Sequence, residues 1–329
     1  MSKIYNWGIL GCGKIARKFS NDLKLLPNAH LYAASSRDYQ KAVDFAAELG
    51  FEKAYGSYEE MVADPAVDVI YVATPHSHHH EHVLLCLHHG KAVLNEKAFA
   101  ITLNEAKEMV ESAREKGVFL MEAFWTRFQP SFVKTLEIIR SGELGPLKLV
   151  RSDFAFNAPK DPKNRLYNLE LGGGSLLDIG IYPVFAALSA LGKPEKIKAL
   201  ATFAASGAEE SIAMAFQYPG GELASLFSSF SCNSFVTTEY NCERGSIRMA
   251  RRWMAPTTIT VWHDDNSEES FNFEQPGNGY QFEAAHVMEC LDAGRTESNL
   301  MPLDFSLELM ETLDRIRQEA GIPFPGRDL

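Results

Sequence analysis

Apolar and polar residues are arranged in two different ways along the chain, and the change falls near residue 125. Before that point, short apolar runs alternate with stretches in which apolar residues recur every three or four positions. This pattern predicts right-handed βαβ crossovers around a parallel sheet that is covered on both faces. The predicted strands are 4–10, 31–35, 67–73, 92–95 and 118–121, and the predicted helices are 14–25, 39–49, 57–63, 78–89 and 103–116.

After residue 125 the strand-like stretches follow one another with short turns such as Pro219-Gly220-Gly221. Consecutive strands joined in this way are typical of an antiparallel sheet, so the second half is predicted to be an α+β domain with a large, mostly antiparallel open sheet. We expect one domain over 1–124 and a second over 125–329. The predicted strands are 148–156, 196–203, 212–218, 223–230, 236–241, 246–249 and 258–262, and the helices are 131–140, 175–191, 280–292 and 303–320.

The second sheet carries a hint about assembly. Large apolar residues in 212–216 alternate with Ala213 and Ala215, so neither set of alternate positions carries a charge. That pattern favours a sheet with both faces covered. Helix 175–191 is expected to cover one face, and either a partner subunit or another layer of the same chain covers the other.

A glycine-rich motif, Gly11-Cys12-Gly13-Lys14-Ile15-Ala16, follows the first strand and opens the first helix. It matches G-x-G-x-x-G/A, in which the first glycine permits a tight turn and the second lets the backbone approach a pyrophosphate. The final small residue keeps the helix close to the sheet, and the helix N-terminus faces the phosphate charge. In this strand–turn–helix context the motif predicts a Rossmann dinucleotide-binding domain rather than a glycine-rich surface turn.

The end of the second strand bears on which dinucleotide is bound. A chain that prefers NAD would place Asp or Glu there to bond the ribose 2′-hydroxyl, but this chain has Ser35-Ser36-Arg37. A hydroxyl and a guanidinium suit a 2′-phosphate, which Arg grips with a planar fork of donors. Asp38, one position further on, is interpreted as the cap of the next helix. We therefore predict NADP(H) in preference to NAD(H).

Seven of the ten histidines fall between His76 and His89. Neighbouring residues of a helix point in different directions, so only pairs such as His78 and His82 can share a face, and Glu81 is misplaced for H-E-x-x-H. We therefore predict no metal site and interpret most of these histidines as polar residues of a helix surface. His76 and His79 are the exceptions, because they follow the carboxyl end of strand 67–73, where open α/β sheets bind ligands.

Three further residues are candidates for catalysis. Lys97 lies just beyond the carboxyl end of strand 92–95, on the side where nicotinamide would lie. Asp178 and Tyr182 are four residues apart, so an α-helix would place them on one face. Pro183 disturbs the helix locally, which suits a substrate-facing site. The alternatives are a surface lysine and a half-buried structural tyrosine.

Over essentially its whole length, the chain resembles the glucose–fructose oxidoreductase / inositol dehydrogenase (Gfo/Idh/MocA) family, and most of all its branch of dihydrodiol and NADP-dependent D-xylose dehydrogenases. The resemblance is carried by the segments 11–16, 54–60, 90–97, 121–128 and 173–182. It implies an N-terminal Rossmann domain and a C-terminal α+β domain whose open sheet forms a homodimer. It also implies oxidation of a sugar, polyol or cyclic diol with NADP+, or the reverse reduction.

The resemblance makes Lys97 and Tyr182 catalytic, and Asp178 matches the aspartate of the same motif as Tyr182. Most of the wider family has His where this chain has Tyr182, and it usually has Pro where this chain has Ala98. Without proline we expect a trans bond between Lys97 and Ala98. The cofactor-binding residues expected from motif and resemblance together are Gly11, Cys12, Gly13, Lys14, Ile15, Ser36, Arg37, Thr74, His76, His79, Glu96, Lys97, Trp125 and Arg127.

Composition narrows the class of partner. The 329 residues carry a formal net charge of −11, which disfavours nucleic acid and anionic membrane surfaces, although Lys14, Arg37, Lys97 and Arg127 could still form a local basic pocket. Five scattered cysteines favour reduced thiols. We find no apolar run near 18 residues and no room for a signal peptide before the first strand, so we expect a cytoplasmic protein.

The expected reaction is hydride transfer between C4 of nicotinamide and a carbinol carbon of a small molecule. Tyr182 would act as general acid/base, and because an unperturbed phenol has a pKa near 10, the Lys97 ammonium would help by favouring the phenolate. Asp178 would orient substrate hydroxyls or hold Lys97 charged. The alternatives are a non-catalytic NADP(H)-binding redox sensor, a reductase of the same fold with a non-sugar substrate, and a zinc-dependent enzyme using the histidines.

Overall fold

The computed structural model describes residues 3–162, 164–324 and 327, and its chain forms two compact units. Unit 1 comprises the chain up to Trp125 together with Gln275–Leu307, and unit 2 comprises Thr126–Glu274 together with the chain from Glu308 onward. The division expected from the sequence, a single boundary between residues 124 and 125, therefore differs from the structure in one respect. A late segment of the chain returns to the first unit.

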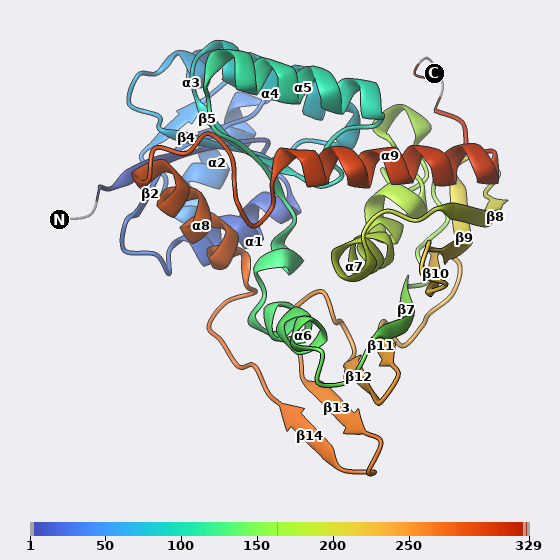
Figure 1. Ribbon diagram of the computed structural model, residues 1–329. Coiled ribbons are helices and arrows are strands. Elements are labelled where there is room, and N and C mark those ends of the chain that lie inside the picture. The colour runs from blue at the N-terminus through green and yellow to red at the C-terminus, as the bar shows by residue number, and fades with distance from the viewer. Residues whose placement is uncertain (1–2, 163, 325–326, 328–329) are drawn as a thin grey trace. The chain divides into compact units, whose positions relative to one another are not determined.

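Unit 1 is built on a parallel sheet whose strands, within the described residues, follow the order β3-β2-β1-β4-β5-β6. The strands are β1 (Tyr5–Leu10), β2 (Ala29–Ser35), β3 (Lys53–Tyr55), β4 (Val69–Val72), β5 (Ala92–Glu96) and β6 (Leu120–Ala123). The helices are α1 (Lys14–Leu23), α2 (Tyr39–Leu49), α3 (Tyr58–Ala63), α4 (His79–His88), α5 (Leu103–Lys116) and α8 (Tyr280–Asp292), labelled in Figure 1. This confirms the predicted Rossmann-like domain.

The strand order of this sheet reverses between β1 and β4, which lie side by side in parallel. At such a switch point the two connecting segments leave the sheet in opposite directions, and a crevice opens beyond the carboxyl ends of the strands. The segments that leave there are the glycine turn after β1 and Thr74 after β4. The edge strand β3 was not predicted, because a strand of only three residues leaves no recognisable alternation.

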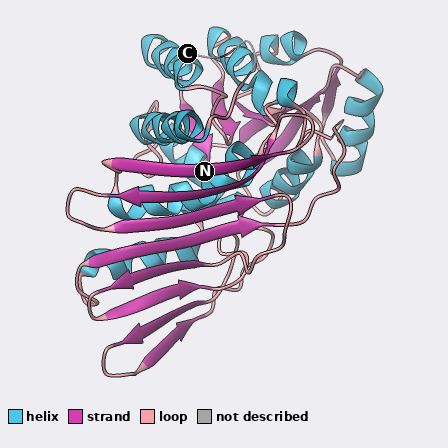
Figure 2. Ribbon diagram, turned by 90° about the vertical axis from the view of Figure 1, so that its right-hand side faces the viewer, coloured by secondary structure: helices cyan, strands magenta, loops and turns pink. Residues whose placement is uncertain are grey.

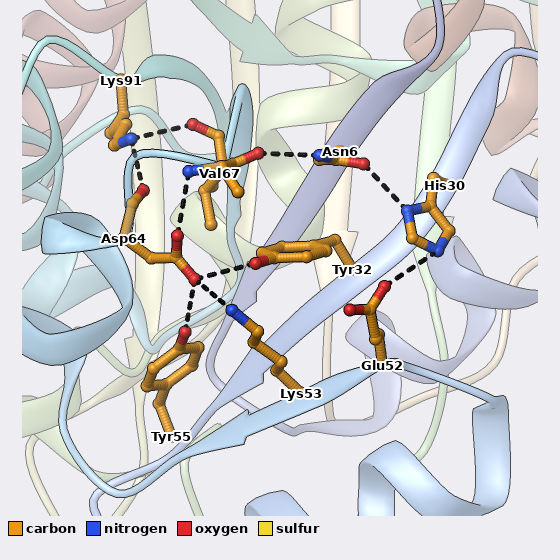
Figure 3. A network of polar contacts seen from close by, with 10 residues as sticks. Asn6, His30, Tyr32, Glu52, Lys53, Tyr55, Asp64, Val67 and Lys91 are labelled. Carbon is orange, nitrogen blue, oxygen red and sulfur yellow. Dashed lines mark hydrogen bonds and ion pairs between the residues drawn. The ribbon is translucent and has the colours of Figure 1, made fainter.

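A polar network fastens the β2–β3 side of this sheet (Figure 3). The carboxylate of Asp64, which follows α3, accepts hydrogen bonds from the hydroxyls of Tyr32 (3.0 Å) and Tyr55 (2.5 Å) and from Nζ of Lys53 (2.9 Å). The buried Lys91 Nζ donates to the backbone carbonyl of Asp64 at 2.6 Å. These bonds join the turn after α3 to three segments of the sheet.

Unit 2 contains a larger sheet whose described strands follow the order β14-β13-β12-β11-β7-β10-β9-β8. All neighbours are antiparallel except β7 and β10, so the predicted mostly antiparallel sheet is confirmed. The strands are β7 (Leu147–Ala155), β8 (Lys196–Phe203), β9 (Glu209–Gln217), β10 (Leu223–Ser229), β11 (Thr238–Cys242), β12 (Gly245–Met249), β13 (Ile259–His263) and β14 (Glu268–Phe271). The helices are α6 (Pro130–Ser141), α7 (Ile181–Leu191) and α9 (Leu303–Ala320), the last of which starts in unit 1 and ends in unit 2.

One face of this sheet is covered by the apolar segment before and within α7, which contacts β7 and β10 as predicted. Figure 2 looks onto the other face, where no helix lies over the strands in the part of unit 2 that the structure describes. There Leu200 is 81% exposed, and the alternate positions Ala213, Ala215 and Ser225 are exposed as well. The alternative of a second covering layer from the same chain is therefore not supported.

No apolar run near 18 residues was expected, but the segment Leu169–Leu191 is long and apolar enough, by composition alone, to cross a membrane. Its most apolar 18-residue stretch is 83% buried inside the protein, as a core segment would be. The segment is also not one regular helix. Leu176–Gly180 forms a π-helix, which α7 continues.

Candidate active site

The glycine turn of unit 1 is closed on one side and open on the other. Gly11 has φ +103°, and a Cβ there would lie 3.1 Å from the carbonyl oxygen of Ala73, so only glycine fits. Gly13 has an extended backbone and precedes α1, and a Cβ at this position would meet nothing within 4 Å. The open side at Gly13 is where the motif predicts that a pyrophosphate approaches.

The other residues of the turn differ in what they can offer. Cys12 is buried, its Sγ lies 3.5 Å from the carbonyl oxygen of Ser35, and burial raises its pKa to about 11. Lys14 is exposed and Ile15 is half-buried. Cys12 is therefore a packing residue that offers a ligand only its backbone. Lys14, in contrast, presents its charge at the surface.

Ser36 and Arg37 follow β2 as expected, and Asp38 does cap a helix. Ser36 is buried, and its Oγ accepts a hydrogen bond from the backbone N–H of Asp38 at 3.2 Å. The carboxylate of Asp38 accepts from the backbone N–H of Lys41 in the first turn of α2. Arg37 is exposed, and its charge opposes the rise that burial causes in the pKa of Tyr58. The only carboxylate directly after this strand is thus bound to a helix end.

His76 and His79, the two predicted exceptions, are buried, and His82 is buried as well. The other four histidines of this stretch are half-buried or exposed, so the prediction of a polar helix surface misses only His82. Nδ1 of His79 lies 2.8 Å from the carbonyl oxygen of Ala98, and Nε2 lies 2.9 Å from that of Thr74. His79 thus bridges the ends of β4 and β5, and burial lowers its pKa to about 4.

His78 and His82 share a face of the helix, as their spacing predicted, with ring centroids 5.6 Å apart. His82 also contacts Thr74, whose Oγ1 lies 3.0 Å from Nδ1 of the imidazole. Burial lowers the pKa of His82 to about 4. Within the described ranges, His, Cys, Asp and Glu side chains do not gather in groups of three or more that could hold a metal ion.

Glu96 and Lys97 lie at the end of β5, at the same edge of the sheet. The buried Glu96 carboxylate accepts a hydrogen bond from the hydroxyl of Tyr71, whose ring stacks on Phe19 of α1 at a centroid distance of 3.8 Å. Lys97 is half-buried, and its charge lowers the pKa of both His79 and Glu122. The ammonium group therefore lies among residues of three neighbouring strand ends.

The bond between Lys97 and Ala98 is cis, so the expectation of a trans bond is wrong. The peptides next to this bond are held by side chains: the carbonyl oxygen of Ala98 lies against His79, and that of Phe99 accepts from Nδ2 of Asn95 at 2.8 Å. Local contacts, rather than the general preference of non-proline peptides, decide the isomer here.

Trp125 ends the first segment of unit 1, and its ring stacks on Tyr280 with centroids 4.5 Å apart. Tyr280 begins α8, in the late segment that returns to unit 1, and it was not predicted as a site residue. One turn further along α8, Glu283 is fully buried, and burial raises its pKa well above the usual range. Because Tyr280 lies so far along the chain, its place beside Trp125 becomes evident only from the return of α8 to unit 1.

Arg127, grouped with the cofactor residues from the sequence, belongs to unit 2. Burial lowers its pKa, and the nearby Arg140 lowers it further. The structure therefore brings most of the predicted cofactor residues to one edge of unit 1. The role of Arg127 stays a prediction.

In unit 2, Asp178 is buried within the π-helix and forms a two-point ion pair with Arg165. Nη1 of Arg165 lies 3.1 Å from Oδ1, and Nη2 lies 3.3 Å from Oδ2. Such a fork fixes the orientation of a carboxylate as well as its charge. Arg165 was not predicted, because a single arginine in a polar loop carries no signal.

Tyr182, in the first turn of α7, lies in an aromatic cluster. Its ring centroid is 5.6 Å from that of Phe154 on β7 and 6.4 Å from that of Trp253, which meets it edge to face. The interpretation of Asp178 and Tyr182 as an α-helical pair is wrong in its geometry, because the intervening turn is a π-helix. π-Helical turns inside helices are frequent at functional sites.

The fold and the glycine turn at its switch point define a dinucleotide-binding protein of the Rossmann class. A family model for oxidoreductases with an NAD-binding Rossmann fold matches residues 5–124, and a model for the GFO/IDH/MocA C-terminal domain matches residues 132–248. The chain therefore belongs to the Gfo/Idh/MocA oxidoreductase family, as its resemblance indicated.

Individual relatives match nearly the full chain. The trans-1,2-dihydrobenzene-1,2-diol dehydrogenase of Mus musculus is 38% identical over 330 residues, which cover 97% of this chain and 98% of that protein. Its counterpart in Homo sapiens is 36% identical over 333 residues, with the same coverage. Among solved structures, aldose-aldose oxidoreductase from Caulobacter crescentus, complexed with glycerol, has a TM-score of 0.88 at 26% identity and covers 97% of this chain and 98% of its own. The protein is an oxidoreductase of this family.

Proposed function

We propose that the protein is an NADP(H)-dependent oxidoreductase that transfers a hydride between nicotinamide and a carbinol carbon of a sugar, polyol or cyclic diol. The observation that carries the proposal is that the open glycine turn after β1, His79 and Lys97 lie at one edge of the parallel sheet of unit 1. That edge is where open α/β sheets bind dinucleotides. The relatives, which are named for diol and aldose oxidation or reduction, support the class of substrate.

The preference for NADP(H) rests on the end of β2. Arg37 is exposed there, beside the Ser36 hydroxyl, and Asp38 is engaged in capping α2 rather than free to bond a ribose 2′-hydroxyl. A planar guanidinium suits a phosphate. In fluorescence titrations we expect NADPH to bind at least tenfold more tightly than NADH, and Arg37→Ala to weaken NADPH binding about tenfold while leaving NADH binding within about twofold. Equal affinities for the two cofactors in the unmodified protein would refute the preference.

The catalytic roles are proposed residue by residue. NADP+, held at the glycine turn, would supply the hydride acceptor, and NADPH would supply the hydride donor in the reverse direction. In oxidation the Tyr182 phenolate takes up the proton of the substrate hydroxyl, and in reduction the Tyr182 phenol gives that proton back, while the Lys97 ammonium stabilises negative charge on the substrate oxygen. Asp178, oriented by Arg165, accepts hydrogen bonds from substrate hydroxyls. The rings of Phe154 and Trp253 pack around the Tyr182 ring and fix its place in the first turn of α7.

The proposed activity is tested by following NADPH absorbance with a panel of aldoses, polyols and cyclic diols in both directions. We expect turnover with at least one member, and turnover that survives an excess of chelator, because the described residues form no metal-binding group. The absence of turnover with every member would refute the substrate class. It would move the interpretation to a binding protein or to a reductase of another kind of compound.

We also propose a homodimer formed through the open face of the unit 2 sheet. Leu200 and Phe203 of β8 and Leu223 of β10 are exposed there or at the ends of these strands, beside the small residues Ala213 and Ala215. A surface of small and apolar residues is typical of an interface. Sedimentation should give a dimer, and Leu200→Asp together with Ala213→Asp should give a monomer. A monomeric unmodified protein would contradict the proposal.

We place the protein in the cytoplasm. Its five cysteines are free, and Cys12, Cys86 and Cys290 among them are buried. Free thiols are typical of a reducing compartment. Fractionation of the source cells should recover the protein with cytosolic enzymes, and its recovery with secreted proteins would contradict this assignment.

A further inference from the structure

A buried carboxylate lies beneath the turn that carries Asp178. Glu209 is the first residue of β9 and is fully buried. Its carboxylate accepts a hydrogen bond from the hydroxyl of Ser175 and another, at 2.9 Å, from the backbone N–H of Leu176. Ser175 and Leu176 begin the π-helix, so one side chain from the sheet holds the start of the segment that continues to Asp178 and Tyr182.

The surroundings of Glu209 are fitted closely to this arrangement. Gly174 has φ +135°, and a Cβ there would lie 3.0 Å from Oε2 of Glu209. Gly180, at the other end of the π-helix, would bring a Cβ within 2.7 Å of Oγ of Ser228, and that oxygen lies 2.9 Å from Oγ of Ser175. The turn can therefore approach Glu209 and Ser228 only because glycine stands on either side of it.

We propose that Glu209 is a positioning residue, which holds the Leu176–Gly180 turn against the sheet and thereby sets the orientation of Asp178 and Tyr182. This inference rests on the catalytic roles proposed above for those two residues. Glu209 acts through the backbone of Leu176 and the hydroxyl of Ser175 and needs no contact with a substrate. The groups that bond this carboxylate are donors, so the ionised form matches the arrangement that the structure describes.

Protonation of Glu209 would change these hydrogen bonds. A neutral carboxyl group donates one bond, and the Ser175–Ser228 pair can reverse to receive it, because either hydroxyl can be the donor. Burial raises the pKa of Glu209 to about 7, so the change falls within an ordinary assay range. The partners that face Glu209 are the Ser175 hydroxyl and the backbone N–H groups of Ser175 and Leu176. The titratable groups on the segment it holds are Asp178 and Tyr182, and the neighbouring Glu210 pairs with Lys160.

The test compares Glu209→Gln with Glu195→Gln, a matched substitution of an exposed glutamate in the same unit. In the unmodified protein we expect kcat to fall as the pH drops through about 7. In Glu209→Gln we expect kcat at pH 8 to be about tenfold lower than in the unmodified protein. The fall in kcat near pH 7, which is the acid limb of the pH profile, should be absent from this variant. The kcat values of the two proteins should therefore meet near pH 5.5. KM for NADP+ should stay within twofold, and Glu195→Gln should follow the unmodified protein throughout. A Glu209→Gln profile that superimposes on the unmodified one would overturn the proposal.

A second variant covers the case in which Glu209→Gln does not fold. Ser175→Ala removes the hydroxyl donor to the carboxylate, which disfavours the ionised form. The limb near pH 7 should therefore move to higher pH by at least half a unit. If the limb stays in place in Ser175→Ala, Glu209 is not its source and the proposal fails.

Thermal unfolding gives a readout that needs no substrate. The folded-state pKa of Glu209 lies above its unfolded value, so the folded protein binds the proton more tightly and gains stability as the pH falls from about 8 to 5. Relative to Glu209→Gln, the unmodified protein should show this gain in Tm. If no turnover is found with any substrate, the proposed function fails while this comparison still reports on Glu209. An identical pH dependence of Tm in the two proteins would overturn the inference by itself.

Discussion

Replacing Asp64 by Asn should destabilise unit 1 by an amount that the structure allows to be worked out. The carboxylate accepts hydrogen bonds from the hydroxyls of Tyr32 and Tyr55, from Lys53 and from the backbone N–H of Ala66. Its side chain is only 11% exposed. Asparagine keeps one acceptor oxygen, but its amide N–H would face groups that are themselves hydrogen-bond donors in the unmodified protein.

The magnitude comes from the two phenol bonds. A hydrogen bond to a charged group contributes about 1.5–3 kcal/mol, and the amide retains part of one of them, which gives a loss of about 2–3 kcal/mol. The bond from Lys53 is left out of the sum because its ammonium is solvated. For a unit of this size the loss corresponds to a fall in Tm of roughly 4–12 °C.

The assay is thermal unfolding of the unmodified protein, of Asp64→Asn and of the control Asp44→Asn. Asp44 is exposed, and its carboxylate accepts a hydrogen bond from the side chain of Gln40. The hydrogen bond from Tyr55, with the other donors, holds the pKa of Asp64 well below its usual range. The contribution of Asp64 is therefore complete above the unfolded-state pKa of about 3.9 and is lost as the pH falls below it. The gap between the unmodified protein and Asp64→Asn should stay constant from pH 5 to 8 and narrow in acid. A loss no larger than that of Asp44→Asn would refute the reasoning.

Three further changes test other parts of the structure. Gly13→Ala should weaken NADPH binding at least tenfold in a titration while changing Tm by no more than about 3 °C. The added Cβ would meet open space in the protein but would stand where the pyrophosphate approaches. Unchanged binding would contradict this placement. Arg165→Met should lower kcat/KM about tenfold or more with NADPH binding intact, and Arg165→Lys should recover only part of it because an ammonium cannot form the two-point pair; full recovery would show that charge alone suffices. Glu122→Gln should become progressively more stable than the unmodified protein as the pH rises from 5 to 8. The reason is that burial raises the pKa of Glu122 to about 8, so its ionisation in the folded state is unfavourable. A constant difference in Tm between the two proteins across that range would refute this.

The sequence predicted the layers of the fold well where periodicity was long and regular. Helices 39–49 and 103–116 have the bounds that their patterns indicated, and the glycine motif lies where its strand–turn–helix context placed it. These elements are specified by local features, namely apolar spacing and side chains that cap the helix ends. Short strands such as β3 carry too few residues to show alternation.

What the sequence could not predict depends on contacts between distant segments. Tyr280 reaches Trp125 only because α8 returns to unit 1, and Arg165 reaches Asp178 from an irregular loop. The π-helical turn before α7 also escaped prediction, and the start of that turn is bonded by the buried Glu209 on another strand. The cis bond after Lys97 belongs to the same class, since its surroundings include His79 from α4.

We propose above that Tyr182 transfers the proton that accompanies hydride transfer. Measuring kcat and the dissociation constant of NADPH for Tyr182→Phe, with the best substrate of the panel, tests this claim. The substitution keeps the ring that packs against Phe154 and Trp253 and removes only the hydroxyl. We expect kcat to fall at least a hundredfold while NADPH binding stays within twofold. Activity that survives within tenfold would contradict the claim and would require another proton donor.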